Sequence, residues 1–104
     1  MKHSSLFKLH LTNVDLNKIL TKIYDNIEKT NDNKLKNIYQ ILDKYRISMS
    51  FSDSIKIESS TEIKLNYNQW LKVINCCRSN EKLSEYLENK INYLKNYPRN
   101  QFIN

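Results

Sequence analysis

The chain has 104 residues, of which 39% are hydrophobic and 27% are charged, and its formal net charge is +6. This length suits a single domain, and this composition excludes an intrinsically disordered chain. No apolar run approaches the roughly 18 residues of a membrane-spanning helix, so we expect neither a membrane span nor a signal peptide. We predict one domain over residues 1–104, ending in a polar tail at 98–104 whose flexibility the sequence leaves open.

The composition also points to an origin. The chain has no Gly, no Ala and one Pro, whereas Lys, Asn and Ile are abundant. The absence of Ala has no folding rationale, because Ala is the best helix former. Codons for the missing residues are rich in G and C, so we infer an AT-rich virus, mobile element or microbe. The same bias supplies Lys, and therefore the positive charge alone does not identify an anionic partner.

The N-terminal part predicts one strand followed by two helices. Apolar and polar side chains alternate in "SLFKLHLT", residues 5–12, as is typical of a half-buried strand. Thr12 and Asp15 then have the spacing of a helix-capping box. The next helix places its apolar residues on one face: Leu16, Ile19, Leu20, Ile23 and Ile27. After a polar break at 30–33, a second helix carries Leu35, Ile38, Leu42 and Tyr45 inward, which predicts an antiparallel helical hairpin.

The period of the apolar residues then changes from 3.6 to 2. Three short alternating segments, "ISMSFS" (47–52), "SIKIES" (54–59) and "TEIKLNY" (61–67), predict an antiparallel β-meander. A helix capped by Asn68 follows, and a last helix with Leu83, Tyr86, Leu87, Ile91 and Leu94 inward ends before Pro98. The predicted order is β-α-α-β-β-β-α-α, an α+β domain in which an antiparallel sheet packs against helices.

One part of this order resembles a known family. The succession of helix, three strands and helix from Asp32 to Cys77 is similar to a double-stranded-RNA-binding domain. The second helix of that family begins with a lysine cluster that faces the phosphates. Here the corresponding start is "NQWLK", residues 68–72, with one lysine. The likeness is therefore one of topology, and it assigns no family.

The rare residues near position 70 are candidates for chemistry, but their spacing favours a core. Trp70, Ile74 and Cys77 fall on one helical stripe, with Cys76 on its flank at a helix C-terminus, where a thiolate is disfavoured. Zinc would have only two histidines and two adjacent cysteines as ligands, without the usual spacing. Gly-rich phosphate loops are missing. We therefore expect no catalytic residues, no cofactor, no metal site and no enzymatic activity.

Charged helix surfaces remain as candidate binding sites. The two predicted N-terminal helices carry a set of basic residues that suits phosphate contact: Lys18, Lys22, Lys29, Lys34, Lys36 and Lys44. The last helix carries an acidic stripe: Glu81, Glu85 and Glu88. Such a stripe interacts favourably with the helix dipole and also suits a basic partner.

The sequence thus predicts a small, non-enzymatic, cytoplasmic binding protein that regulates or inhibits a larger macromolecule. A protein partner is the leading expectation, with a homodimer through an exposed strand edge as one form of it. The alternative is a nucleic-acid-binding regulator that uses the lysine-rich helical surface.

Overall fold

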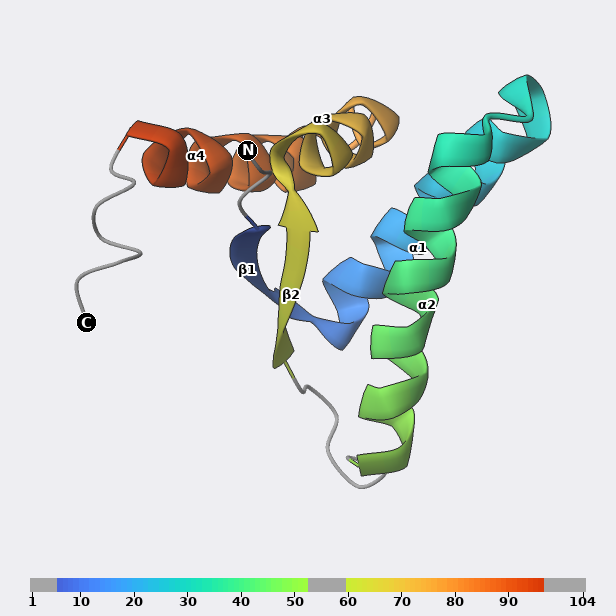
Figure 1. The fold of residues 1–104 in the computed structure, drawn as a ribbon, viewed down its shortest axis with the longest axis horizontal. Coiled ribbons are helices and arrows are strands. Elements are labelled where there is room, and N and C mark those ends of the chain that lie inside the picture. Colours follow the sequence, from blue (N-terminus) through green and yellow to red (C-terminus); the bar gives the residue numbers. More distant parts are fainter. Residues whose placement is uncertain (1–5, 53–59, 97–104) are drawn as a thin grey trace. The chain divides into compact units, whose positions relative to one another are not determined.

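The computed structural model describes residues 6–52 and 60–96. Its elements, in chain order, are β1 (Leu6–Thr12), α1 (Asn13–Thr30), α2 (Asn33–Ser52), β2 (Ser60–Asn66), α3 (Tyr67–Cys76) and α4 (Glu81–Asn96) (Figure 1). In the described part, the two strands pair with each other in an antiparallel sheet. The predicted α+β class is confirmed.

The chain divides into two compact units. The hairpin unit is His10–Ile63, and the terminal unit combines Met1–Leu9 with Lys64–Asn104. Each unit contains part of both strands, because the division falls within β1 and within β2. The prediction of a single domain over residues 1–104 stays a prediction, and residues 98–104 lie outside the described part.

The hairpin unit consists mainly of α1 and α2, which pack against each other as predicted. Thr12 caps α1, since its Oγ1 accepts a hydrogen bond from the Asp15 N–H at 3.1 Å. Asn31 ends the helix in the left-handed region with φ of 56°, and Asp32 Oδ1 then accepts the Lys34 N–H at 2.8 Å to start α2. The buried apolar side chains of the two helices are Leu16, Ile19, Leu20, Ile23, Leu35, Ile38, Leu42 and Met49.

Residues 47–52 correct the sequence prediction, because they continue α2 and form no strand. Their alternation also satisfies a helix: Met49 follows Leu42 by seven residues, so both side chains fall on the buried face. No Gly or Pro intervenes to end the helix. The predicted strand at 54–59 lies outside the described residues. The third predicted strand is present as β2, which spans residues 60–66 instead of 61–67.

The terminal unit begins α3 two residues earlier than a cap at Asn68 predicts. Asn66 is the N-cap: its Oδ1 accepts the Gln69 N–H at 2.8 Å, and Gln69 Oε1 accepts the Asn66 N–H at 2.9 Å. Tyr67, predicted as the last strand residue, is therefore the first residue of the helix. The buried side chains of α3, its C-cap Cys77 and α4 are Trp70, Val73, Ile74, Cys76, Cys77, Leu83, Ser84, Leu87 and Ile91.

Candidate binding surfaces

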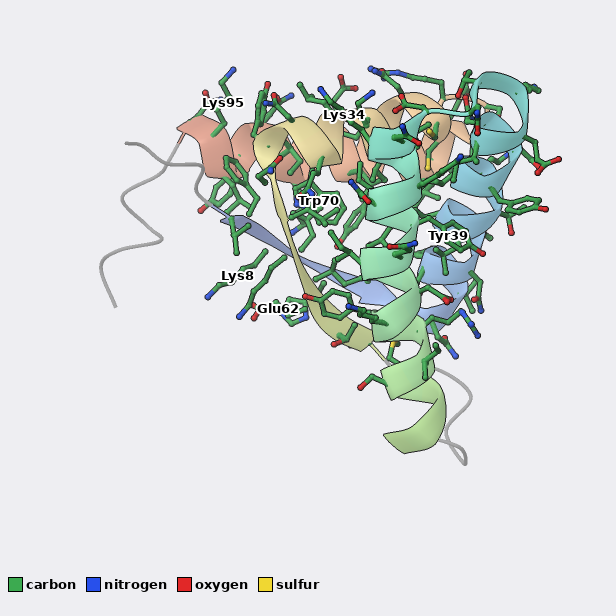
Figure 2. The ribbon with its side chains drawn as sticks, turned by 45° about the vertical axis from the view of Figure 1, so that its right-hand side comes forward. Lys8, Lys34, Tyr39, Glu62, Trp70 and Lys95 are labelled. Carbon is green, nitrogen blue, oxygen red and sulfur yellow. The ribbon has the colours of Figure 1, made fainter. Side chains whose placement is uncertain are left out.

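Trp70 and the two cysteines belong to the core of the terminal unit. Trp70 is completely buried, and its indole N–H donates to the Phe7 carbonyl oxygen at 2.9 Å, which joins α3 to β1 (Figure 2). Cys76 and Cys77 are buried, and no disulfide joins them. Their burial agrees with the core position that their helical spacing predicts.

The polar histidine of β1 lies on the solvent side of the sheet. His10 is exposed, and its Nε2 lies 3.7 Å from Glu62 Oε2 on β2. Within residues 6–52 and 60–96, no three His, Cys, Asp or Glu side chains are grouped so that they could hold a metal ion. The same residues include no helix that is long and apolar enough to cross a bilayer.

The three predicted binding lysines of α1 do share one side of that helix. At 100° per residue, Lys18, Lys22 and Lys29 fall within an arc of about 40°. Lys18 and Lys29 are exposed, and Lys22 is partly buried. Asp25 falls close to the same arc and is exposed, so the positive potential of this side is reduced.

The lysines of α2 do not extend that side into one surface. Lys34 lies in the first turn of α2 (Figure 2), and Lys36 lies roughly 160° from it around the helix axis. Lys44 falls between them, about 80° from each, on the side away from the buried residues. The six predicted lysines are therefore distributed around the helical hairpin, and they are not gathered on a single face.

The net charge is divided unequally between the two units. The hairpin unit contains eight basic and eight acidic residues, so its formal charge is zero. The terminal unit contains nine basic and three acidic residues, which accounts for the whole +6. The region that the sequence suggested for phosphate contact is therefore electrically balanced, and the cationic surplus belongs to the other unit.

The predicted acidic stripe lies on α4, as expected. Glu81, Glu85 and Glu88 fall within an arc of about 60°, centred roughly 115° from the middle of the buried face of that helix. Glu88 is in part neutralised, because its Oε1 lies 3.4 Å from Nη1 of Arg78, in an ion pair with both side chains about half exposed. Two exposed glutamates, Glu81 and Glu85, thus remain as the acidic part of this stripe.

A groove between α1 and α2 was not predicted. It has a volume of about 520 Å³ and is open to solvent. Six side chains of the hairpin unit line it: Asn17, Leu20, Thr21, Tyr24, Tyr39 and Arg46. The rings of Tyr24 and Tyr39 are tilted against each other with centroids 6.3 Å apart. Arg46 Nε donates to Asp43 Oδ1 at 2.7 Å, so the positive charge beside the groove is balanced.

An exposed apolar side chain continues the groove along α1. Tyr24, in the lining, is 52% exposed, and Val14 is 45% exposed. Val14 lies three residues before Asn17, so it shares the helix face that lines the groove. Ile47 of α2 is 42% exposed but is turned about 80° from Tyr39 around the helix axis, outside the groove. Tyr24 and Val14 together make the α1 side of the groove suited to docking.

The side of α4 next to its acidic stripe carries a second unpredicted feature. Lys82, Tyr86, Lys90 and Tyr93 are spaced at i, i+4, i+8 and i+11, within an arc of about 80°. Lys90 Nζ lies 5.8 Å from the centroid of the Tyr86 ring. Tyr86, predicted to face the core, is only partly buried, and Tyr93 is 53% exposed. We call these four residues the lysine–tyrosine stripe.

The end of α4 carries a related contact. Lys95 Nζ lies 4.9 Å from the centroid of the Tyr67 ring, and the Phe7 ring packs against the same tyrosine at 5.8 Å (Figure 2 labels Lys95). Lysine and tyrosine are thus in contact at two places on the terminal unit, which also has the surplus of positive charge.

Comparisons with protein-family models, with curated proteins and with solved structures give no match to this chain. Two surfaces of the described residues are the candidates for function: the groove of the hairpin unit and the lysine–tyrosine stripe of the terminal unit.

Proposed function

We propose that the chain is a non-enzymatic binding protein that regulates or inhibits a larger protein, and that it docks this partner in the groove between α1 and α2. The observation that carries the proposal is the open groove of about 520 Å³ with Tyr24, Tyr39 and Arg46 in its lining. Tyrosine and arginine are enriched among the residues that contribute most to protein–protein binding.

The occupant we propose is an amphipathic helix of the partner. Two antiparallel helices form a shallow channel that accepts the apolar side chains of a third helix at i, i+3, i+4 and i+7. The amide of Asn17 and the hydroxyl of Thr21 add polar groups at the rim of this channel. The hairpin unit has a formal charge of zero, which favours a partner held by apolar contact over one held by long-range attraction.

The proposal assigns no catalysis, cofactor or metal to the chain. A binding role of this kind suits the small size of the chain and its inferred origin in an AT-rich virus, mobile element or microbe. In this proposal the groove between α1 and α2, and not the acidic stripe of α4, is the main contact surface, because Glu88 of that stripe is already in an ion pair.

Affinity capture with matched variants tests the proposal. The tagged chain is incubated with an extract of its host cells, and each captured protein is quantified for the wild type, for Tyr24→Ser with Val14→Ser, and for the control Leu6→Ser. Leu6 is 51% exposed, close to the 52% of Tyr24, and it lies on β1, outside both the groove and the lysine–tyrosine stripe. We expect a specific protein that the wild type and the control retain and the groove variant loses.

The captured protein is then purified and its affinity is measured by calorimetry. We expect Tyr24→Ser to weaken binding at least tenfold, which is about 1.4 kcal/mol. If the groove variant and the wild type capture the same proteins equally well, or if neither captures any, the docking proposal is wrong.

A nucleic-acid-binding regulator is the second candidate function. The observation that favours it is the concentration of the entire +6 net charge on the terminal unit. For this second candidate we propose a surface on the terminal unit instead of the lysines of α1 and α2.

A further inference from the structure

We propose that the lysine–tyrosine stripe of α4 binds single-stranded nucleic acid. Lys82 and Lys90 would contact phosphates, while Tyr86 and Tyr93 would stack against bases. This site goes beyond the protein-docking groove, because it lies on the other unit and takes a ligand of another class.

Charge complementarity supports a polyanionic ligand. The terminal unit has a formal charge of +6, and the two lysines of the stripe are exposed. Its three acidic residues fall on a different side of α4, centred roughly 130° from the stripe. A phosphate chain along the stripe would therefore meet lysines and avoid the glutamates.

The order of residues along the helix supports a strand with accessible bases. Lys82 and Lys90 are eight residues apart, or about 12 Å along the helix axis, and Tyr86 and Tyr93 are about 10 Å apart. Cationic and aromatic side chains therefore alternate over more than two helical turns. Surfaces that bind single strands combine these two residue types, because every base has a face that stacks on an aromatic ring.

The exposure of Tyr93 indicates that this ring is accessible to bases. Tyr93 is 53% exposed, a large value for an aromatic side chain in a helix that buries its other face. Tyr86 is partly buried, and Lys90 Nζ lies 5.8 Å from the centroid of its ring. A base that stacks on Tyr86 would displace Lys90 from the ring, and the lysine would then pair with a phosphate of the same strand.

A single strand fits this surface better than a duplex. Stacking on tyrosine requires bases that are not stacked within a helix. Sequence readout in the major groove uses arginine or lysine at guanine and asparagine or glutamine at adenine. Of these residue types the stripe contains only lysines, which the proposal assigns to phosphates. We therefore expect binding with little sequence preference and a strong dependence on salt.

Fluorescence anisotropy with a labelled 20-nucleotide oligo(dT) tests the proposal at 50 and 200 mM NaCl. The variants are Lys82→Glu with Lys90→Glu in the stripe, and Lys18→Glu with Lys22→Glu in the hairpin unit as a control with an identical change in net charge. Circular dichroism verifies that each variant is folded. We expect micromolar binding by the wild type at the lower salt, at least a tenfold loss for the stripe variant, and less than a threefold loss for the control.

Tyr93→Ala separates stacking from attraction between charges. It leaves the charge unchanged, so we expect it to weaken oligo(dT) binding about tenfold while the slope of affinity against salt stays the same. An equal loss for the two lysine pairs would show that net charge alone is responsible and would overturn the site. Absence of binding at 50 mM salt, or tighter binding to a 20-base-pair duplex than to the single strand, would overturn it as well.

Discussion

Replacement of Trp70 by Phe removes one hydrogen bond from the terminal unit and leaves the hydrophobic contact largely in place. The indole N–H bonds to the Phe7 carbonyl oxygen at 2.9 Å, across 63 residues of sequence. Loss of a hydrogen bond costs about 1 kcal/mol net, and more when the abandoned carbonyl stays out of water. The smaller ring leaves a void in a fully buried position, which adds roughly 1 kcal/mol. We expect Trp70→Phe to lower the free energy of unfolding by about 2–3 kcal/mol.

Urea denaturation followed by far-ultraviolet circular dichroism measures this change. For a chain of this length it corresponds to a fall in Tm of roughly 10–20 °C. Tyr24→Phe is the control: it removes the hydroxyl of a tyrosine that is 52% exposed and keeps the ring, so its effect should stay below about 0.5 kcal/mol. If Trp70→Phe is as stable as this control, the indole does not hold β1 to α3 and the reasoning is refuted.

Three further predictions concern caps and thiols. Asn66→Ala should destabilise the chain by about 1 kcal/mol in urea denaturation, whereas Asn68→Ala should have less than half of that effect; the reverse order would contradict the observed start of α3. Asn31→Gly should match or exceed wild-type stability in the same assay, and Asn31→Ala should lose about 1 kcal/mol, because φ is 56° there; equal stabilities would contradict that conformation. Cys76 and Cys77 should react with a thiol reagent at least roughly tenfold more slowly in the folded chain than in urea, since both are buried, and equal rates would contradict their burial.

The sequence predicted both helices of the hairpin correctly because their apolar residues repeat over several turns. It failed at 47–52, where only six residues alternate. A run this short satisfies a strand and the end of a helix equally well, and Met49 occupies the buried face in either case. What decides the outcome is the uninterrupted preceding helix, which no Gly or Pro ends.

The charged surfaces were harder to predict than the core. Spacing along one helix placed Lys18, Lys22 and Lys29 on one side correctly. The relation between residues on different helices depends on packing, and so Lys34 and Lys36 could not be placed beside them from the sequence. The groove likewise requires the pairing of α1 with α2, whereas the lysine–tyrosine stripe lies on one helix and its spacing was already visible in residues 82–93.

The hydrogen bond between Trp70 and Phe7 has a consequence for how the chain folds during its synthesis. The terminal unit joins residues 1–9 to the segment after residue 63, so the hairpin unit is synthesised between its two parts. The hairpin unit is continuous in sequence and is held by contacts between neighbouring helices, which form fast. We expect α1 and α2 to form while translation continues, and the N-terminal strand to wait for α3. During that interval Leu9 has no completed core to enter, which gives translation speed an influence on whether nascent chains fold or associate.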